Sequence, residues 1–238
     1  MKAVILAAGV GSRLGEVTKN IPKPLLEING ETILERNIKK VREIGINEVF
    51  INTHYYPDMI KNCLGNHKFN LNIKYSFESE LLGTSGALNN FKKYLNEDFL
   101  IIYGDNYFTF SLQELIDFHK LKNSKCTIAL HYRENVSQSG VVLTDNDNKI
   151  IDFIEKPDEQ KNVSSHLVNA GIYICSPDIF SFIPSGYSDF GKDIFPGMIK
   201  SGSSLYGIEL TGYLLPVDTI ELLNKSREMK YDISKSSI

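Results

Sequence analysis

Apolar residues follow two alternating patterns along the first half of the chain, one typical of strands and one typical of helices. The continuous apolar run KAVILAA at residues 2–8 predicts a strand buried on both faces of a parallel sheet. Residues 31–45 instead place apolar side chains at helical spacing, with Gly45 positioned to end the helix. Further strands are predicted at 47–53, 71–76 and 98–105, and further helices at 55–65, 84–95 and 111–122. This alternation predicts an α/β fold with a doubly wound, mostly parallel central sheet.

The pattern changes after residue 125 and predicts a mixed α+β second half. Strands are expected at 126–132, 139–145, 149–157, 167–175 and 204–210, and helices at 177–183, 192–200 and 219–229. The sequence DNDN at 145–148 has turn composition, which indicates an antiparallel hairpin. Because neither a low-complexity linker nor a repeat separates the halves, we expect one domain over residues 1–238 with a shared sheet. The polar segment 231–238 is expected to fray.

Composition narrows the class of protein. The 238 residues are 42% apolar and 23% charged, which is typical of a globular protein with a real core. A net charge of −3 argues against a nucleic-acid partner, and no run approaches the ~20 apolar residues of a membrane span. Three scattered cysteines without a CxxC motif indicate reduced thiols and a cytoplasmic protein, and the histidine spacing disfavours a zinc site.

The loop LAAGVGSRLG at residues 6–15 follows the first predicted strand. It is not a dinucleotide fingerprint, because the third glycine is replaced by Leu14, and it lacks the Gly-Lys of a P-loop. The loop lies at the carboxyl edge of the sheet, where α/β proteins bind ligands, and its glycines permit a turn that points N–H groups at an anion. Arg13 adds a fork suited to phosphate, and Lys23 stands between two prolines. A glycine turn with incidental surface charges is the alternative.

Two other strand ends carry candidate chemistry. Asp105 ends an apolar strand in GDN, where a carboxylate beside a phosphate loop would suit a Mg²⁺ ion; a simple turn is the alternative. Glu155 and Lys156 end another strand, where the cation would pair a phosphate and the carboxylate would accept hydrogen bonds from sugar hydroxyls. A surface ion pair is the alternative there.

Ordered motifs over about residues 1–200 resemble the sugar-1-phosphate nucleotidyltransferases, the nucleotide-sugar pyrophosphorylases. The motifs are LAAGVGSRL…PKPLLEINGETILE, LLGTSGAL, GDNYF, SGVV, FIEKP and NAGIYI. The resemblance implies a Rossmann-like nucleotidyltransferase fold, with an NTP-binding half at about 1–125 and a sugar-phosphate-binding half at about 126–238. It also implies Mg²⁺-dependent transfer of a nucleotidyl group from an NTP to a sugar 1-phosphate, giving an NDP-sugar and pyrophosphate, for surface polysaccharide synthesis.

The resemblance assigns roles to residues of both halves. Arg13 matches the arginine that steadies the β- and γ-phosphates, Lys23 the lysine near the reacting phosphates and Asp105 the Mg²⁺ ligand, so these three residues would carry catalysis. The other NTP-binding positions implied are Leu6, Ala8, Gly9, Gly11 and Gly83. The sugar-phosphate positions implied are Gly140, Glu155, Lys156 and Asn169, with Lys156 on the phosphate.

The sequence departs from the family pattern near the second metal carboxylate. An ungapped alignment of GYLLPVDTIELL puts Pro216 at that position, but VDT resembles the CMP-sugar synthetases, whose aspartate is a ligand. We therefore predict that Asp218 shares the metal with Asp105; a site with one protein carboxylate is the alternative. Ser139 and Gly191 replace a frequent tyrosine and glutamate on the sugar side.

The segment ESELLGTSGAL looks most like the guanylyltransferases that act on mannose- or heptose-1-phosphate. Thymidylyl-, uridylyl- or cytidylyltransferases for another sugar phosphate or phosphocholine remain alternatives, as does a catalytically silent nucleotide-sugar binding module. A homodimer is compatible with the resemblance.

Overall fold

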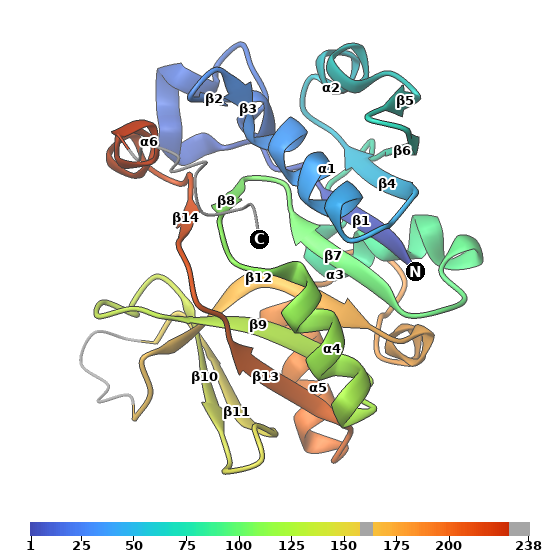
Figure 1. Cartoon of the computed structure of the whole chain (residues 1–238), viewed down its shortest axis with the longest axis vertical. Helices are drawn as coiled ribbons and strands as arrows, with labels where there is room; N and C mark the ends of the chain where they lie inside the picture. The colour runs from blue at the N-terminus through green and yellow to red at the C-terminus, as the bar shows by residue number, and fades with distance from the viewer. Residues whose placement is uncertain (158–163, 229–238) are drawn as a thin grey trace.

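One ten-stranded sheet runs through both halves of the chain in the computed structural model, which describes residues 1–157 and 164–228 (Figure 1). Its centre has the order β7-β1-β4-β6, and these four strands are mutually parallel. They are β1 (Lys2–Leu6), β4 (Glu48–Thr53), β6 (Leu71–Phe77) and β7 (Phe99–Tyr103). The predicted parallel sheet is confirmed. Since the strand order reverses beside β1, a crevice for ligands is expected between the carboxyl ends of β1 and β7.

The second half extends this sheet with antiparallel pairs. Its strands are β9 (Cys126–Tyr132), β10 (Gly140–Thr144), β11 (Ile150–Glu155), β12 (Leu167–Cys175) and β13 (Leu205–Glu209). The long strand β12 pairs with β7 near its end and with β9 and β10, so it joins the halves. A bulge between Asn169 and Tyr173 separates the two registers with β9. The predicted hairpin is the antiparallel pair β10–β11.

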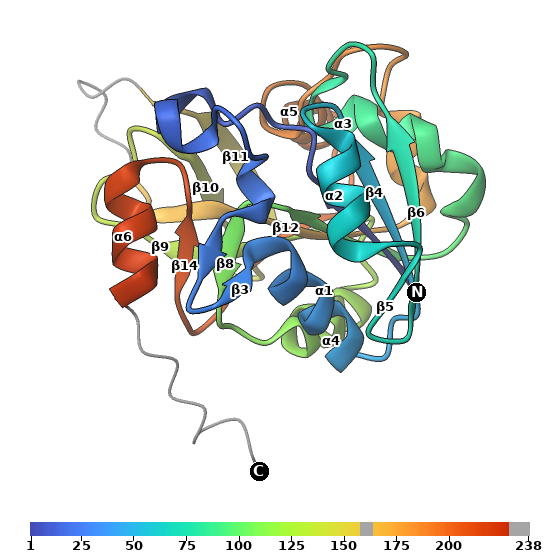
Figure 2. The ribbon, with the colours of Figure 1, turned by 90° about the horizontal axis from the view of Figure 1, so that it is seen from above.

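Helices cover both faces of the sheet, as Figure 2 shows. On one face lie α1 (Ile33–Glu43), α2 (Pro57–Leu64) and α4 (Leu112–Lys122), whose apolar side chains share a core with Ile5 and Ile102. On the other face α5 (Phe195–Lys200) and the 3₁₀ helix 87–94 pack in a second core with Val4 and Ile101. Because neighbouring residues of β1 and β7 face opposite cores, both strands are apolar apart from Lys2 at the start of β1.

Local signals explain where several helices begin and end. Thr32 and Glu35 form a reciprocal capping box at the start of α1, and Gly45 follows its end with a φ of 78°. Pro57 opens α2 and Gly65 caps it. Ser111 accepts the N–H of Glu114 at 3.4 Å at the start of α4, which is one half of the expected box.

Three expectations about helices need correction. Residues 84–95 are not one helix capped by Thr84: α3 (Gly83–Gly86) is a short turn that continues as the 3₁₀ helix 87–94, and Thr84 donates to Asp189 instead. The segment 177–183 is a 3₁₀ helix at 177–181. The helix expected from 192 starts two residues earlier, as a π turn at 190–194 that leads into α5.

Five strands of two or three residues were not expected, because they are too short to show a period. They are β2 (Glu27–Ile28), β3 (Glu31–Thr32), β5 (His67–Lys68), β8 (Asn106–Phe108) and β14 (Leu214–Pro216). The last helix, α6 (Ile220–Glu228), follows β14. The end of the expected helix at residue 229 and the polar segment 231–238 lie outside the described residues.

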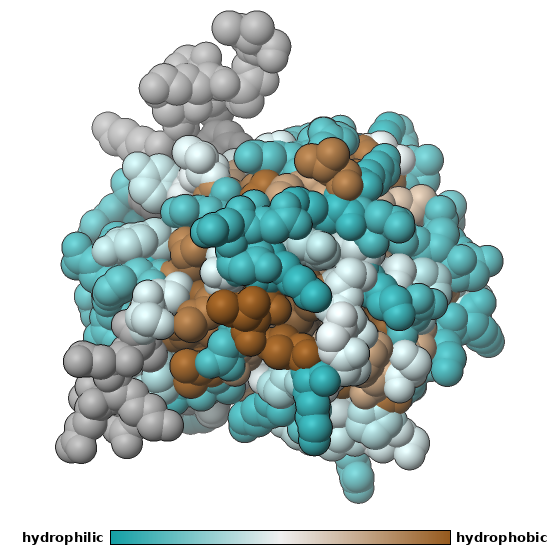
Figure 3. Space-filling model, turned by 90° about the horizontal axis from the view of Figure 1, so that it is seen from below, coloured by the Kyte–Doolittle hydropathy of each residue, from teal (hydrophilic) through white to brown (hydrophobic). Residues whose placement is uncertain are grey.

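The surface is mixed, as the composition indicated. The face in Figure 3 is mostly hydrophilic, with an apolar area near its centre and a smaller one near its upper edge. Within 1–157 and 164–228, no helix combines the length and apolarity needed to cross a bilayer. The cysteines are free thiols, and Cys126 and Cys175 face each other across β9 and β12 with their Sγ atoms 3.2 Å apart.

Candidate active site

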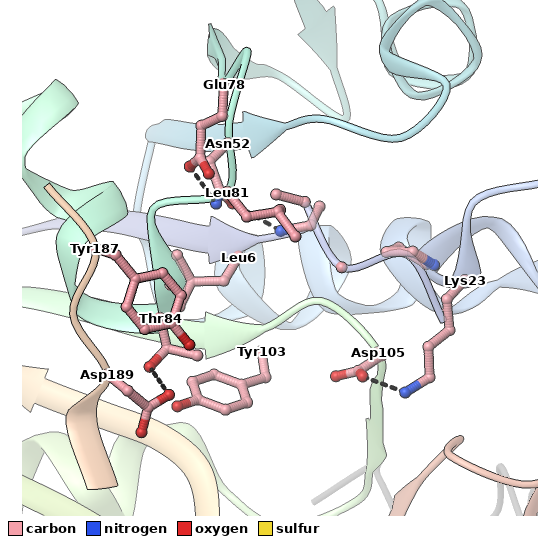
Figure 4. Close-up of a pocket in the computed structure, with 15 residues that line it drawn as sticks. Leu6, Lys23, Asn52, Glu78, Leu81, Thr84, Tyr103, Asp105, Tyr187 and Asp189 are labelled. Carbon is pink, nitrogen blue, oxygen red and sulfur yellow. Dashed lines mark hydrogen bonds and ion pairs between the residues drawn. The ribbon is translucent and has the colours of Figure 1, made fainter. Parts of the chain in front are cut away.

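A pocket of about 250 Å³, here the β1 pocket, opens at the carboxyl ends of the four parallel strands (Figure 4). Six of the eight predicted NTP-binding residues line it: Leu6, Ala8, Gly9, Lys23, Gly83 and Asp105. At its far end the carboxylate of Glu78 accepts hydrogen bonds from Asn52 Nδ2 at 2.8 Å and from the N–H of Leu82 at 3.0 Å. Asn52 in turn accepts the N–H of Ala7 at 2.8 Å, which fixes both side chains to the glycine loop.

Gly11 and Arg13 do not line the β1 pocket. A Cβ at Gly11 would lie 3.2 Å from Lys23 Cβ and from Thr18 Cγ2, and the φ of Gly11 is 69°, so this glycine lets the loop pack closely against Lys23. The loop then turns into a 3₁₀ helix at 12–18. Arg13 leaves it toward a neighbouring pocket, where its Nη1 lies 3.5 Å from a carboxylate oxygen of Asp218.

Lys23 is the centre of the site. It is 6% exposed, and its ammonium donates to both Asp105 and Asp218. Burial alone would lower the pKa of Lys23, but the two carboxylates raise it above its ordinary value. Burial would raise the pKa of Asp218, but Lys23, Arg13 and Arg133 together lower it. These contacts therefore favour the charged forms of Lys23 and Asp218.

The backbone explains how Asp218 reaches Asp105. Strand β14 pairs with β8 in a register that sets Pro216 opposite Asn106, the residue after Asp105. The N–H of Val217 donates to the carbonyl of Asp105 at 3.2 Å, and the N–H of Asp218 turns back to Pro216 at 2.8 Å. The locked ring of Pro216 ends the pairing, and this turn aims Asp218 inward.

The pair Asp105 and Asp218 fits a Mg²⁺ ion by the chemistry of its donors. The two carboxylates lie close enough to share the ammonium of Lys23, and Mg²⁺ commonly takes one or two carboxylates together with phosphate oxygens and water. Among residues 1–157 and 164–228, no group of three or more His, Cys, Asp or Glu side chains could hold a metal without further ligands. A phosphorylated ligand would have to supply the remaining oxygens.

A second pocket of about 370 Å³, here the β12 pocket, adjoins the first and shares Thr84, Tyr103, Asp105 and Asp189 with it. All four predicted sugar-phosphate residues line it, together with Arg13 and Asp218: Gly140, Glu155, Lys156 and Asn169. The structure thus brings the candidates from both halves into one crevice.

Glu155 occupies space that two glycines leave open. Its Oε2 would lie 2.9 Å from a Cβ at Gly140 and 2.5 Å from a Cβ at Gly191. Burial and the neighbouring Asp189 raise the pKa of Glu155, while Lys156 and Lys192 oppose that shift. The glycine at 191, a departure from the family pattern, therefore makes room for this carboxylate.

Asn169 has a structural task besides lining the pocket. Its Oδ1 accepts the N–H of Gly171 at 2.9 Å, and its Nδ2 donates to the hydroxyl of Tyr173 at 2.8 Å. These bonds stabilise the bulge in β12, where Gly171 has a φ of 66°.

Sequence reasoning missed several residues of the crevice. Asn52 and Glu78 carry the same sequence signal as Asp105, because they lie at or just after the ends of β4 and β6. Asp189 caps the π turn by accepting N–H groups of Gly191 and Lys192, and Arg133 follows β9. A loop residue such as Asp189 carries no signal in the sequence that places it beside β1.

A parallel sheet whose crevice combines a glycine loop, paired carboxylates and several cations has the features that suit a phosphorylated ligand. The family described as nucleotidyl transferase matches residues 2–218. The chain is 32% identical over 226 residues to a UTP–glucose-1-phosphate uridylyltransferase of Synechocystis sp., covering 88% of this chain and 58% of that one. It is 35% identical over 222 residues to a mannose-1-phosphate guanylyltransferase catalytic subunit beta of Dictyostelium discoideum, covering 91% and 61%.

Solved structures show the same fold. A putative glucose-1-phosphate thymidylyltransferase of Bacillus anthracis, in complex with a sucrose, superposes with a TM-score of 0.87 at 25% identity, covering 97% of each chain. HddC of Yersinia pseudotuberculosis, complexed with GMP-PN, superposes with a TM-score of 0.80 at 27% identity, covering 95% of this chain and 98% of that one.

The chain belongs to the nucleotidyl transferase family. The resemblance found from the motifs is thereby confirmed, and so is the nucleotidyltransferase fold. The chain spans about three fifths of the length of the curated relatives it matches.

Proposed function

We propose that this protein transfers a nucleotidyl group from an NTP to a sugar 1-phosphate, with Mg²⁺, and releases pyrophosphate. The observation that carries the proposal is the Lys23–Asp105–Asp218 cluster at the junction of two pockets. The nucleotide would lie in the β1 pocket and the sugar phosphate in the β12 pocket, with their phosphates meeting at the cluster. This arrangement divides one domain into an NTP half and a sugar-phosphate half.

The chemistry is an in-line displacement. A phosphate oxygen of the sugar 1-phosphate attacks the α-phosphorus of the NTP, and pyrophosphate leaves on the opposite side. Since a phosphate dianion is already nucleophilic, the site needs to position two polyanions and neutralise charge. Lys23 would contact the reacting phosphates, Arg13 the departing pyrophosphate and Lys156 the acceptor phosphate. Mg²⁺ held by Asp105 and Asp218 would stabilise developing negative charge.

We further propose guanine as the base. Glu78 and Asn52 lie at the end of the β1 pocket away from Lys23 (Figure 4). A carboxylate only accepts hydrogen bonds, so it suits the adjacent N1–H and N2–H donors of guanine and repels the two carbonyls of uracil or thymine. The second N–H of Asn52 would serve the O6 of guanine. The complex of HddC with GMP-PN supports the same base.

For the sugar we propose a mannose- or heptose-type 1-phosphate, made into an NDP-sugar for surface polysaccharide. The mannose-1-phosphate guanylyltransferases among the relatives support this choice. Uridylyl- and thymidylyltransferase relatives make those nucleotides the second candidates.

The test is pyrophosphate release with Mg²⁺ from four NTPs and a panel of sugar 1-phosphates, with Asp105→Asn as the inactive control. The highest kcat/KM is expected for GTP with a mannose- or heptose-type 1-phosphate. Tight nucleotide binding without turnover for any pair would instead indicate a silent binding module.

Glu78→Gln tests the base. An amide offers both a donor and an acceptor, so the preference for GTP over UTP should fall by about tenfold or more. Glu80→Gln, an exposed neighbour, is the matched control and should leave the preference unchanged. An unchanged preference in the Glu78 variant would reject this assignment.

A further inference from the structure

Arg133 is a charged group of the crevice to which neither the motifs nor the proposed roles assign a task. It directly follows β9, lines the β12 pocket and does not line the β1 pocket. Its backbone is held on both sides by His166: the Arg133 N–H donates to the His166 carbonyl at 3.0 Å, and the Arg133 carbonyl lies 3.0 Å from His166 Nδ1. The side chain therefore starts from a fixed position.

The guanidinium of Arg133 has more N–H donors than the described residues use. Its one side-chain hydrogen bond within residues 1–157 and 164–228 runs from Nη1 to Ser139 Oγ at 3.4 Å. In the same part of the chain no carboxylate lies within ion-pair distance of it. Burial lowers the pKa of Arg133, and the charge of Asp218 opposes that shift. A guanidinium has five N–H donors in a planar fork that matches two phosphate oxygens at once.

Ser139 joins Arg133 to Lys156. The carbonyl of Ser139 accepts the N–H of Lys156 at 3.0 Å, while its hydroxyl accepts the hydrogen bond from Arg133. Lys156 itself has a φ of 47°, a conformation that non-glycine residues rarely adopt, and this backbone bond holds it there. Ser139 thus bonds both the guanidinium of Arg133 and the backbone of Lys156, and all three residues line the β12 pocket.

His131 supports the same location. It lines the β12 pocket, is 9% exposed, and burial together with the charge of Arg133 lowers its pKa to about 4. The imidazole is therefore neutral at physiological pH, so it does not add to the positive charge. Arg133 and Lys156 are then two cations available to an anion bound beside Ser139, and Arg13 is a third cation of the same pocket.

We propose that Arg133, oriented by Ser139, binds the phosphate of the sugar 1-phosphate together with Lys156. This deepens and rests on the proposed function: the acceptor dianion would be held by the fork of Arg133 and the ammonium of Lys156, next to Asp218. The assignment to the acceptor rests on the place of Arg133 in the chain: Arg133 and Ser139 line the β12 pocket with Lys156, and β9 belongs to the half of the chain that builds this pocket. Arg13 also lines the β12 pocket, but it comes from the glycine loop after β1.

The experiment is calorimetric titration of the full chain with mannose 1-phosphate and glucose 1-phosphate. Mg²⁺ and a GTP analogue with a methylene group between the α- and β-phosphorus atoms would be present to prevent turnover. Arg133→Gln should weaken sugar-phosphate binding by about 10- to 100-fold, since it removes a charge-assisted contact. Arg133→Lys should lose less, Ser139→Ala should lose a few-fold, and affinity for the GTP analogue alone should stay within about twofold.

Arg42→Gln is the matched control, because this exposed arginine of α1 bonds the carbonyl of Phe69 outside both pockets. Unchanged sugar-phosphate affinity in Arg133→Gln would overturn the assignment, and so would equal losses for both ligands. If Arg133→Gln fails to fold, Arg133→Lys with an intact melting curve replaces it. Unchanged sugar-phosphate affinity in that variant, or equal losses for both ligands, would again overturn the assignment.

The outcomes separate the two proposals. A wild-type chain that binds sugar 1-phosphates through Arg133 but never releases pyrophosphate would reject the proposed activity and leave the Arg133 assignment intact. Full turnover, with a KM for the sugar 1-phosphate in Arg133→Gln equal to that of the wild type, would support the proposed activity and reject the Arg133 assignment. A wild-type chain that binds no sugar 1-phosphate of the panel would overturn both.

Discussion

Lys23 shows how one side chain can hold a binding site in its shape before any ligand arrives. It is almost fully buried, yet it carries a charge because two carboxylates surround its ammonium. Without that ammonium, Asp105 and Asp218 would repel each other across a short distance. We infer that Mg²⁺ and Lys23 compete for the same carboxylate oxygens, so that metal binding would free the ammonium for phosphate.

Lys23→Met should therefore lower thermal stability, and Mg²⁺ should restore it. Removing Lys23 from its cluster with the half-exposed Asp105 and Asp218 is expected to lower the free energy of unfolding by about 1–3 kcal/mol. This corresponds to a decrease of several degrees in Tm for a chain of this size. The measurement is a melting curve with and without millimolar Mg²⁺. Lys19→Met, on the same loop but exposed, is the control. Equal stabilisation of the variant and the wild type by Mg²⁺ would contradict the competition.

Arg13→Ala should affect rate far more than stability. The side chain is 55% exposed, and its one ion pair with a described residue, Asp218 at 3.5 Å, is long, so its removal should leave Tm nearly unchanged. Loss of a charged contact to the transition state should lower turnover by ~10²-fold or more. Steady-state kinetics beside a melting curve tests this. Half of the activity with intact stability would remove Arg13 from the catalytic set.

At the level of elements, long periodic segments were predictable and short ones were not. The runs at 3–8 and 99–103 are apolar because both faces of β1 and β7 are covered, and that property is visible in the sequence. The short turn and 3₁₀ helix that replace the expected helix at 84–95 have a cause distant in sequence. A Cβ on Gly83 or Gly86 would clash with the carbonyl of Ser188 or Gly186, so this segment is shaped by a loop about 100 residues away.

The residues of the candidate site also differ in how far the sequence could predict them. Asp105 could be anticipated because it follows the parallel strand β7, and the carboxyl ends of parallel strands are where ligands bind. Glu155 and Lys156 were found at the end of a predicted strand, although that strand, β11, pairs antiparallel with β10. The approach of Asp218 to Asp105 depends on the pairing of β14 with β8, which are three residues each and have no detectable period. Arg133 and Asp189 become candidates only when the register of the second half is known.

The contact between β11 and the π turn at 190–194 gives a prediction for Gly191→Ala. The added Cβ would displace the carboxylate of Glu155, whose flexible end can move, so the fold should persist. Affinity for the sugar 1-phosphate should fall by about 2- to 10-fold, the loss expected when a hydrogen-bonding group is misplaced. Gly197→Ala in α5 is the control, because the nearest atom to its Cβ is 4.0 Å away. A melting curve and titration of both variants test this, and equal affinities would refute it.

For the molecule as a whole, the Lys23–Asp218 contact joins positions 195 residues apart and thereby fastens the end of the described chain to its beginning. The pairing of β14 with β8 and a hydrogen bond from Arg227 Nε to the carbonyl of Glu27 at 3.1 Å act in the same direction. Figure 1 shows β14 beside β8 and leading up to α6, which lies near β2. The crevice is therefore closed on one side by a segment from the far end of the sequence.

The contribution of the Lys23–Asp218 contact to the stability of the fold should depend on pH. The folded pKa of Asp218 is lowered from 3.8, so its contribution is present above that value and is lost as pH falls through the folded pKa. The pKa of Lys23 is raised from 10.5, so its contribution is lost only as pH rises beyond that value. The contact should thus stabilise the fold across the whole neutral range.

Asp218→Asn tests the acid side. Its Tm should be lower than that of the wild type at neutral pH, and the two curves should converge below pH 3.8, where the carboxylate of the wild type becomes protonated. A series of melting curves at different pH values measures this, with the exposed Asp117→Asn of α4 as control. A difference in Tm that is the same at every pH would show that Asp218 acts through something other than its charge.

The space shared by Glu155 and Gly191 limits which side chains these two positions can carry together. A side chain at 191 cannot be added while the carboxylate of Glu155 keeps its present position, because a Cβ there would lie 2.5 Å from Oε2. Changes at these positions are therefore coupled, and their effects will not add. A shorter side chain at 155 should make Gly191→Ala less disruptive than it is in the present sequence.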